Sequence, residues 1–296
     1  MINNLFENAP VVIFAYNRPE KLNALLKSLE KNKEFEDTEV IFYIDNVKFQ
    51  SDKKLHKEVI NVASKEWRCR SKKINVNPSN IGLKKNILSG IDKTFEVYDT
   101  GIFLEDDLIV SESFLYFMNK SLSEYKNIPE VMHISGYNYP FLFSKKSKSY
   151  FSTVMNCWGW STWKDRWIEN NNFSKNLISS LENKKRRRFN VFGFEKDFES
   201  QLIRNEIKEL ETWAIYWYQY IFLNGGLCVQ PLKSLVQNKG MDGSGERKIR
   251  SNFYKSKLNN SRISTYPKNI KFLNSHKAQL IIFFIYKTFK KNYFKA

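Results

Sequence analysis

The segment Pro10–Leu29 reads PVVIFAYNRPEKLNALLKSL and contains two patterns that together predict the fold. Its first part, Pro10–Tyr16, is a continuous apolar run with the length of a buried strand. In its second part, leucines recur at the three- and four-residue spacing of an amphipathic helix, at Leu22, Leu25, Leu26 and Leu29. A buried strand followed directly by such a helix is the repeating unit of a parallel α/β sheet.

The same alternation continues along the first part of the chain. Apolar runs predict further strands at Thr38–Asp45, Lys72–Val76 and Gly101–Glu105, and helical spacing predicts a helix from Leu83 to Phe95. We therefore expect an α/β fold with a parallel, doubly wound central sheet. Ligands of such sheets bind outside the carboxyl ends of the strands.

Polar residues follow the predicted strands at these ends. They are Asn17 and Arg18 after the first strand, Asp45 after the second, and Glu105, Asp106 and Asp107 after the fourth. Adjacent carboxylates raise each other's pKa and destabilise a fold unless a cation or strong donors lie beside them. In an extended segment Glu105 and Asp107 point one way and Asp106 the other. A hard divalent cation shared with substrate phosphates fits this pattern, and simple capping of a helix near Ser111 is the alternative.

Composition narrows the class of protein. The 296 residues carry a formal net charge of +17, which suits nucleic acid, an anionic membrane or a phosphorylated substrate. Cys69, Cys157 and Cys228 form no CxxC pair, which predicts neither a disulfide framework nor a zinc site and suits a reducing cytosol. The sequence has no secretory signal pattern, no GxxxxGKS loop and no GxGxxG motif.

Basic residues are concentrated in two places. Residues 246–296 hold thirteen Lys or Arg against the single acid Glu246. Within this tail, Leu280–Tyr286 is too short to span a bilayer, and we expect either an interfacial helix on an anionic leaflet or a helix docked on the core. The cluster Lys184–Phe189, KKRRRF, is typical of a nucleic-acid or membrane patch, or of a solvated loop.

Two further motifs are candidates for binding. The segment Cys157–Trp167 holds four Trp residues, of which Trp158 and Trp160 are candidates to stack on a sugar ring, with core packing as the alternative. The segment Gly240–Lys248, GMDGSGERK, is typical of an anion-binding loop or of a surface turn.

An ordered set of segments resembles bacterial sugar transferases with a GT-A fold. They are PVVIFAYNRPEKLNALLKSL, IGLKKNILSGI, FLEDDLIVSESFLYFM, ISGYNYP, CWGWSTWKDRW and NGGLCVQPLKSLVQNKGMDGSG. FLEDDLIVSESFLYF is also similar to the metal-binding segment of the N-acetylglucosaminyltransferase that begins complex N-glycan synthesis. The resemblance implies a Rossmann-like GT-A domain over residues 1–245, with a donor-binding half of about 1–110 and an acceptor-binding half of about 111–245, followed by the basic tail 246–296.

The resemblance also implies roles for individual residues. Asp107 would hold Mn²⁺ or Mg²⁺, while Glu105 and Asp106 would face the donor sugar and ribose. The other donor-binding candidates are Asn17, Arg18, Asp45, Gly243, Ser244 and Arg247, and the acceptor-binding candidates are Trp158 and Trp160.

The general base is the point at which the sequence departs from the family pattern. Relatives often carry an Asp where this chain has Ala214, and a methyl group takes no proton. Glu211, one helical turn earlier if the helix extends that far, is the candidate. Glu211 as an ordinary first-turn acid is the alternative, and Glu209, Asp197 and Asp242 are the other acids considered.

These observations predict a metal-dependent, inverting glycosyltransferase. The expected donor is a UDP-linked N-acetylhexosamine, and the expected acceptor is a glycan or lipid-linked glycan in bacterial lipopolysaccharide or capsule synthesis. We expect a cytoplasmic protein, peripheral on the inner membrane face through its tail. Nucleic acid is not an expected partner, because it does not explain the acidic strand end. A nucleotidyltransferase and an inactive nucleotide-sugar-binding protein are the alternatives.

Overall fold

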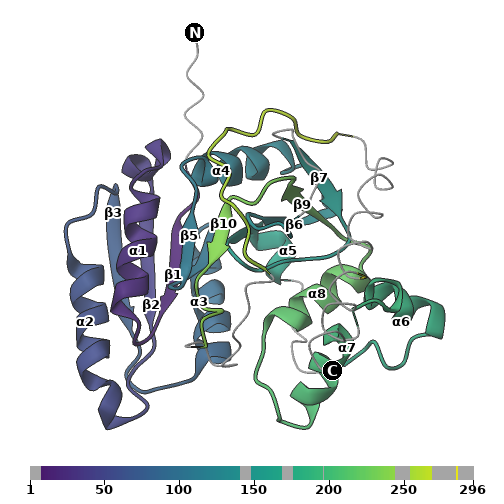
Figure 1. Ribbon diagram of the computed structural model, residues 1–296, viewed down its shortest axis with the longest axis horizontal. Helices are drawn as coiled ribbons and strands as arrows, with labels where there is room; N and C mark the ends of the chain where they lie inside the picture. Colours follow the sequence, from purple (N-terminus) through teal and green to yellow (C-terminus); the bar gives the residue numbers. More distant parts are fainter. Residues whose placement is uncertain are drawn as a thin grey trace.

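The computed structural model describes residues 8–140, 148–168, 176–195, 197–243, 254–268 and 285. Eight strands form one sheet in the order β3-β2-β1-β4-β8-β6-β9-β7 (Figure 1). Their bounds are β1 Val11–Ala15, β2 Glu39–Ile44, β3 Ser71–Val76, β4 Thr100–Glu105, β6 Val131–Ser135, β7 Ser149–Ser152, β8 Trp160–Trp163 and β9 Leu227–Pro231. A second, two-stranded sheet pairs β5 (Leu108–Val110) with β10 (Val236–Asn238).

The central sheet is mostly parallel. Strands β1 to β4 pair in parallel, β8 runs antiparallel between β4 and β6, β9 is parallel to β6, and β7 is antiparallel at the edge. The strands expected near residues 10–16, 38–45, 72–76 and 101–105 are therefore confirmed.

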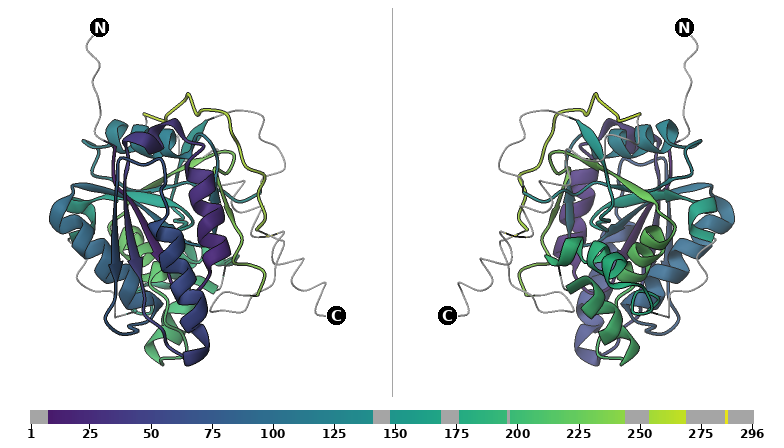
Figure 2. Two further views of the ribbon diagram at one scale, coloured as in Figure 1. Left: turned by 90° about the vertical axis from the view of Figure 1, so that its left-hand side faces the viewer. Right: turned by 90° about the vertical axis from the view of Figure 1, so that its right-hand side faces the viewer.

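Helices cover both faces of this sheet, as expected. The α-helices are α1 Pro19–Leu29, α2 Lys53–Ser64, α3 Leu83–Val97, α4 Phe114–Glu124, α5 Lys164–Ile168, α6 Asn183–Phe189, α7 Asp197–Glu206 and α8 Ala214–Leu223. The short 3-10 helices are η1 Lys33–Asp37, η2 Gln50–Asp52 and η3 Val191–Gly193. The end-on views in Figure 2 place α3 on the opposite side of the sheet from α1 and α2.

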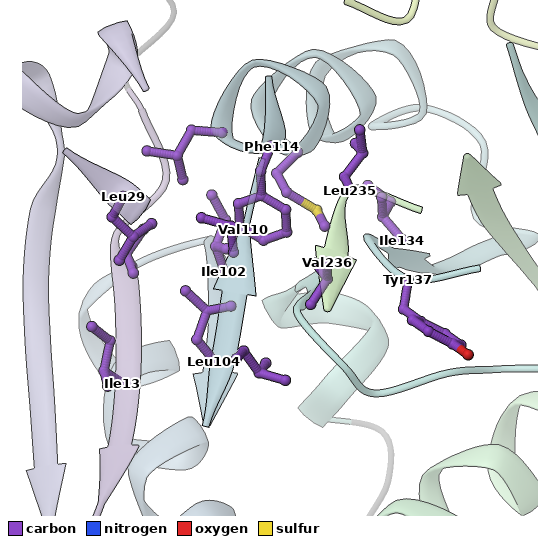
Figure 3. Packing of buried hydrophobic residues seen from close by; sticks show 14 of the residues in the cluster. Ile13, Leu29, Ile102, Leu104, Val110, Phe114, Ile134, Tyr137, Leu235 and Val236 are labelled. Atoms are coloured by element: carbon purple, nitrogen blue, oxygen red, sulfur yellow. The ribbon is translucent and has the colours of Figure 1, made fainter. Parts of the chain in front are cut away.

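Each face has its own apolar core, because successive side chains of a strand point to opposite faces. In β1, Val11 and Ile13 pack with α1, α2 and α4, whereas Val12 and Phe14 pack with α3 and α8. Figure 3 shows the first core where Leu104 of β4, Val110 of β5 and Val236 of β10 gather near Phe114 of α4. This packing ties β5 and β10 to the end of β4.

The described part of the basic tail belongs to the same packed body. Tyr137 Oη donates to the carbonyl of Tyr254 (2.8 Å), Tyr125 Oη donates to that of Pro267 (2.9 Å), and Ile263 is buried. Residues 254–268 therefore pack on the domain, and the boundary at residue 246 stays a prediction. The apolar run Leu280–Tyr286 lies outside the described residues except for Ile285. Among the described helices, none has the length and apolarity that crossing a membrane requires.

Candidate functional site

The strand order reverses between β1 and β4, which is where open α/β sheets bind ligands. From β1 the chain builds β2 and β3 towards one edge, while β4 pairs with the other side of β1. The ends of β1 and β4 bring Arg18 against Asp106 and Asp107. Arg18 is also the N-cap residue of α1, where Pro19 fixes the first helical position.

One guanidinium serves two buried carboxylates in this site. Arg18 Nη1 donates to Asp107 Oδ2 at 2.7 Å, and Nη2 donates to Asp106 Oδ1. Burial raises the pKa of Asp106 to about 6, and the charge of Asp107 adds to this rise while Arg18 opposes it. The expected alternation fails here, because β4 ends at Glu105 and the chain turns at Asp106 and Asp107, so that both acids meet Arg18.

Each carboxylate keeps one oxygen without a partner among the described residues. Asp106 Oδ2 and Asp107 Oδ1 are both buried and accept no hydrogen bond. Buried polar atoms are nearly always paired, so this pair of oxygens suits a cation. Oxygen donors of this kind suit Mg²⁺ or Mn²⁺.

The chain supplies only part of such a coordination shell. Across the described ranges, no cluster of three or more His, Cys, Asp or Glu side chains is able to hold a metal ion. A hard cation at Asp106 and Asp107 therefore needs further ligands from water and from a bound phosphate group, which is the usual way for Mg²⁺ to bind.

The loop after β10 closes over Asp107. Lys239 N donates to the Asp107 carbonyl at 2.8 Å, and Gly240 lies so near the carboxylate that a Cβ there would overlap Asp107 Oδ2. Lys21 of α1 fixes this loop through the Lys239 carbonyl (3.1 Å) and through an ion pair with Asp242 (3.0 Å). The start of the predicted anion-binding loop, up to Gly243, thus lies beside the acids, while Ser244 and Arg247 lie outside the described residues.

Asp45 is buried, and both of its carboxylate oxygens accept hydrogen bonds from protein donors. They accept bonds of 2.9–3.1 Å from the side chains of Asn77 and Asn80 and from the backbone nitrogens of Asn46, Ile81 and Gly82. Asp45 therefore holds the loop 77–82 at the start of α3, a role that the sequence analysis did not foresee. Its predicted contact with a nucleotide stays a prediction.

Asn17 faces η2. Its Nδ2 donates to Asp52 Oδ1 at 3.1 Å, and Tyr16 Oη donates to Asp52 Oδ2 at 2.6 Å. Burial and the bond to Asp52 raise the pKa of Tyr16 to about 12. The sequence analysis missed Tyr16, Lys21 and Asp52, because each acquires its role through a residue far away in the chain.

The two candidate Trp residues lie in different environments. Trp158 is half-buried and lines a cavity of about 180 Å³ together with Asn238, Lys239, Met241, Asp242, Tyr254 and neighbouring residues. Trp160 is only 2% exposed and packs among Phe103, His133 and Trp213. The expectation for Trp160 is therefore corrected, since a ring enclosed on all sides offers no face to an acceptor.

Glu211 is not on the helix that was expected to position it. Helix α8 begins at Ala214, and Glu211 is exposed in the segment before it, near Lys84. Burial lowers the pKa of Lys84, and the charge of Glu211 opposes this shift. Of the other acids considered, Glu209 pairs with Arg204 and Asp197 accepts a bond from Gln201. Asp242 pairs with Lys21 and also lines the Trp158 cavity.

Comparisons with known proteins find likenesses among solved structures. No family model matches the chain, and no curated protein matches it. Among solved structures, the mannosyltransferase PcManGT from Pyrobaculum calidifontis in complex with GDP-Man and Mn²⁺ is similar over 73% of this chain and 69% of that chain, with a TM-score of 0.41 and 7% identity. The eight-stranded, mostly parallel sheet with helices on both of its faces is itself the α/β fold that the sequence predicts.

Proposed function

We propose that the chain is a glycosyltransferase that uses a nucleotide-sugar donor and a divalent cation. The observation that carries the proposal is the pair of buried carboxylates, Asp106 and Asp107, each with an unpartnered oxygen, at the point where the strand order reverses. Breaking a glycosyl–phosphate bond leaves negative charge on the diphosphate, and a cation held by carboxylates is suited to such a leaving group.

Asp107 is the proposed ligand of Mn²⁺ or Mg²⁺, with Asp106 beside it. When bound, the cation acts as a Lewis acid that stabilises the charge on the departing diphosphate. Arg18 holds both carboxylates in place, and the backbone of residues 239–243 closes the site over Asp107. Glu105, at the end of β4, is proposed to face the donor sugar.

The acceptor is proposed to bind in the cavity beside Trp158. The Trp158 and Tyr254 rings meet edge to face at 5.9 Å, and a sugar ring stacks well on such aromatic walls. Asp242 lines the same cavity, and its place there favours it over Glu211 as the carboxylate that takes the proton of the acceptor hydroxyl. An inverting, single-displacement reaction requires such a base.

Finer features of the proposal rest on the family resemblance. They are a UDP-linked N-acetylhexosamine as donor, a glycan or lipid-linked glycan of bacterial lipopolysaccharide or capsule as acceptor, and a place on the inner face of the membrane. The charge of the tail 246–296 supports membrane attachment.

Release of nucleoside diphosphate from a panel of nucleotide sugars tests the proposal. We expect one donor to be consumed with Mn²⁺ and not with a chelator, and Asp107→Asn to abolish the release. Asp99→Asn, which changes an exposed acid next to the other end of β4, is the matched control. Asp242→Asn and Glu211→Gln then identify the base. Donor binding without release in the presence of acceptor would indicate an inactive nucleotide-sugar-binding protein instead.

A further inference from the structure

Helix α6 presents a dense group of cations outside the candidate active site. Five basic residues occupy its seven positions, and the exposed ones are Lys184, Lys185, Arg187 and Arg188. Of the five basic residues of α6, only Arg186 forms an ion pair with a described residue. It donates to Glu199 Oε1 at 2.6 Å. Four like charges so close together repel one another, which a protein tolerates more readily where an anionic partner offsets the repulsion.

The turn that follows α6 adds an apolar element to these cations. Phe192 and Phe194 are 43% and 39% exposed, whereas Phe189 and Val191 on either side of Asn190 are buried. Phe189 stacks on Tyr218 with ring centroids 4.7 Å apart. Buried Phe189 and Val191 therefore fix the turn to the core, while the rings of Phe192 and Phe194 are partly exposed to solvent.

The backbone of this turn is costly to maintain. Val191 and Phe192 have φ values of 48° and 59°, in the left-handed region that residues with side chains rarely adopt, and only the following Gly193 is suited to it. A β-branched residue such as Val191 is among the least tolerant. Strain of this kind, at a turn that exposes an aromatic ring, points to a function for that ring.

Hydrogen bonds hold α6 and the turn in one arrangement. Asn190 Nδ2 donates to Glu199 Oε2 at 2.9 Å, and its carbonyl accepts from Gly193 and Glu195. Arg186 binds the same Glu199 of α7. The cations of α6 and the exposed rings therefore form one preformed surface, in the lobe of α6, α7 and α8 at the lower right of Figure 1.

We propose that α6 and the turn 191–194 dock the protein onto an anionic lipid bilayer. Lys and Arg side chains bind anionic headgroups, and phenyl rings gain by entering the headgroup layer. Single-stranded nucleic acid offers the same charge, and its bases stack on phenyl rings, so binding of oligonucleotides is the alternative outcome of the test below. The exposed acids beside the surface, Glu182 and Asp197, are fewer than its cations, while Glu199 pairs with Arg186 and Glu195 is buried. The docking surface is formed by described residues that are not part of the tail 246–296, and it does not depend on the reaction catalysed.

Sedimentation of the full chain with lipid vesicles tests this assignment. We expect binding to vesicles of equimolar phosphatidylglycerol and phosphatidylcholine, little binding to pure phosphatidylcholine, and release by salt. Lys184→Gln/Lys185→Gln should weaken the binding about 25-fold, since each cation near an anionic surface contributes about fivefold. The matched control is Lys53→Gln/Lys54→Gln, which removes two exposed lysines from α2.

The turn allows a sharper test. Asn tolerates the left-handed backbone better than Phe, so Phe192→Asn should leave the melting temperature unchanged or raise it while weakening vesicle binding about tenfold. If the Phe192 ring had only a structural role, its loss would not weaken vesicle binding while leaving the melting temperature unchanged or raised. Phe49→Asn, which removes an aromatic ring that is 59% exposed elsewhere, should leave vesicle binding as it is.

Three results would overturn the assignment. One is equal vesicle binding by the α6 and α2 variants, which would indicate that the tail, and not α6, attaches the protein to the membrane. Another is equal or absent binding of the native chain on both kinds of vesicle. The third is binding of single-stranded oligonucleotides that the α6 variant loses while vesicle binding is unchanged.

Discussion

Replacing Arg18 by Met removes the one guanidinium that serves two buried carboxylates. Asp106 and Asp107 then lack both charge-assisted bonds from Arg18. Breaking a buried ion pair on one side leaves uncompensated charge, which costs about 3–5 kcal/mol of unfolding free energy when both acids are ionised. We expect Arg18→Met to lose this amount at pH 8.

The loss should depend on pH in a defined direction. In the native protein the pKa of Asp106 is raised from 3.8 to about 6, so between these values the folded state holds a proton that the unfolded state has released. Stability therefore falls as pH rises through this range. Without Arg18 the pKa of Asp106 rises further, so the stability of the variant keeps falling above pH 6. The unfolding free energy that Arg18→Met loses should therefore be smaller at pH 5, about 1–2 kcal/mol.

Urea unfolding at pH 5 and pH 8 measures this difference. Arg68→Met is the matched control, because the Arg68–Glu36 pair is exposed and its loss should cost less than about 1 kcal/mol at either pH. Mn²⁺ should restore part of the stability that Arg18→Met loses, since a second cation then compensates the same two carboxylates. A loss at pH 8 no greater than that of Arg68→Met, or a loss independent of pH, would refute the electrostatic account of this site.

Three further outcomes follow from burial and contact. Trp160→Ala should cost about 3–5 kcal/mol by urea unfolding because it empties the core, whereas Trp158→Ala should cost much less and instead abolish transfer to the acceptor; equal costs would contradict this distinction. Gly240→Ala should lower both the melting temperature and the affinity for Mn²⁺, because its methyl group displaces the Asp107 carboxylate, and a variant with native Mn²⁺ affinity would contradict the contact. Burial lowers the pKa of His133 to about 3, so its ring stays neutral in the fold and its contribution to stability falls as pH drops below about 6.5, by up to about 1.4 kcal/mol per pH unit; His133→Gln should lack this part of the slope.

The first part of the fold, about residues 1–110, is predictable from local sequence patterns. Strands such as Val11–Ala15 are continuous apolar runs, and the leucines of α1 have helical spacing, so each element carries its own signal. The strands β7 and β8 have only four residues each and run against the parallel direction. Their place depends on pairing with distant strands, which no local period reveals.

The candidate site also has features that the sequence predicts and features that only the fold shows. The sequence places Arg18, Asp106 and Asp107 at one edge of the sheet, but it does not show that the chain turns after Glu105 and directs both Asp side chains to Arg18. Gly240 reaches Asp107 only because β10 pairs with β5. Contacts of this kind are properties of the fold, and no spacing in the sequence encodes them.

Calorimetric titration with UDP-, GDP-, CMP- and dTDP-sugars, with Mn²⁺ and with a chelator, tests the central claim most directly. We predict that one nucleotide sugar binds the native chain only when Mn²⁺ is present, and that Asp107→Ala, shown to be folded by circular dichroism, does not bind it. Failure of the folded native chain to bind any of these donors in the presence of Mn²⁺ would contradict the account.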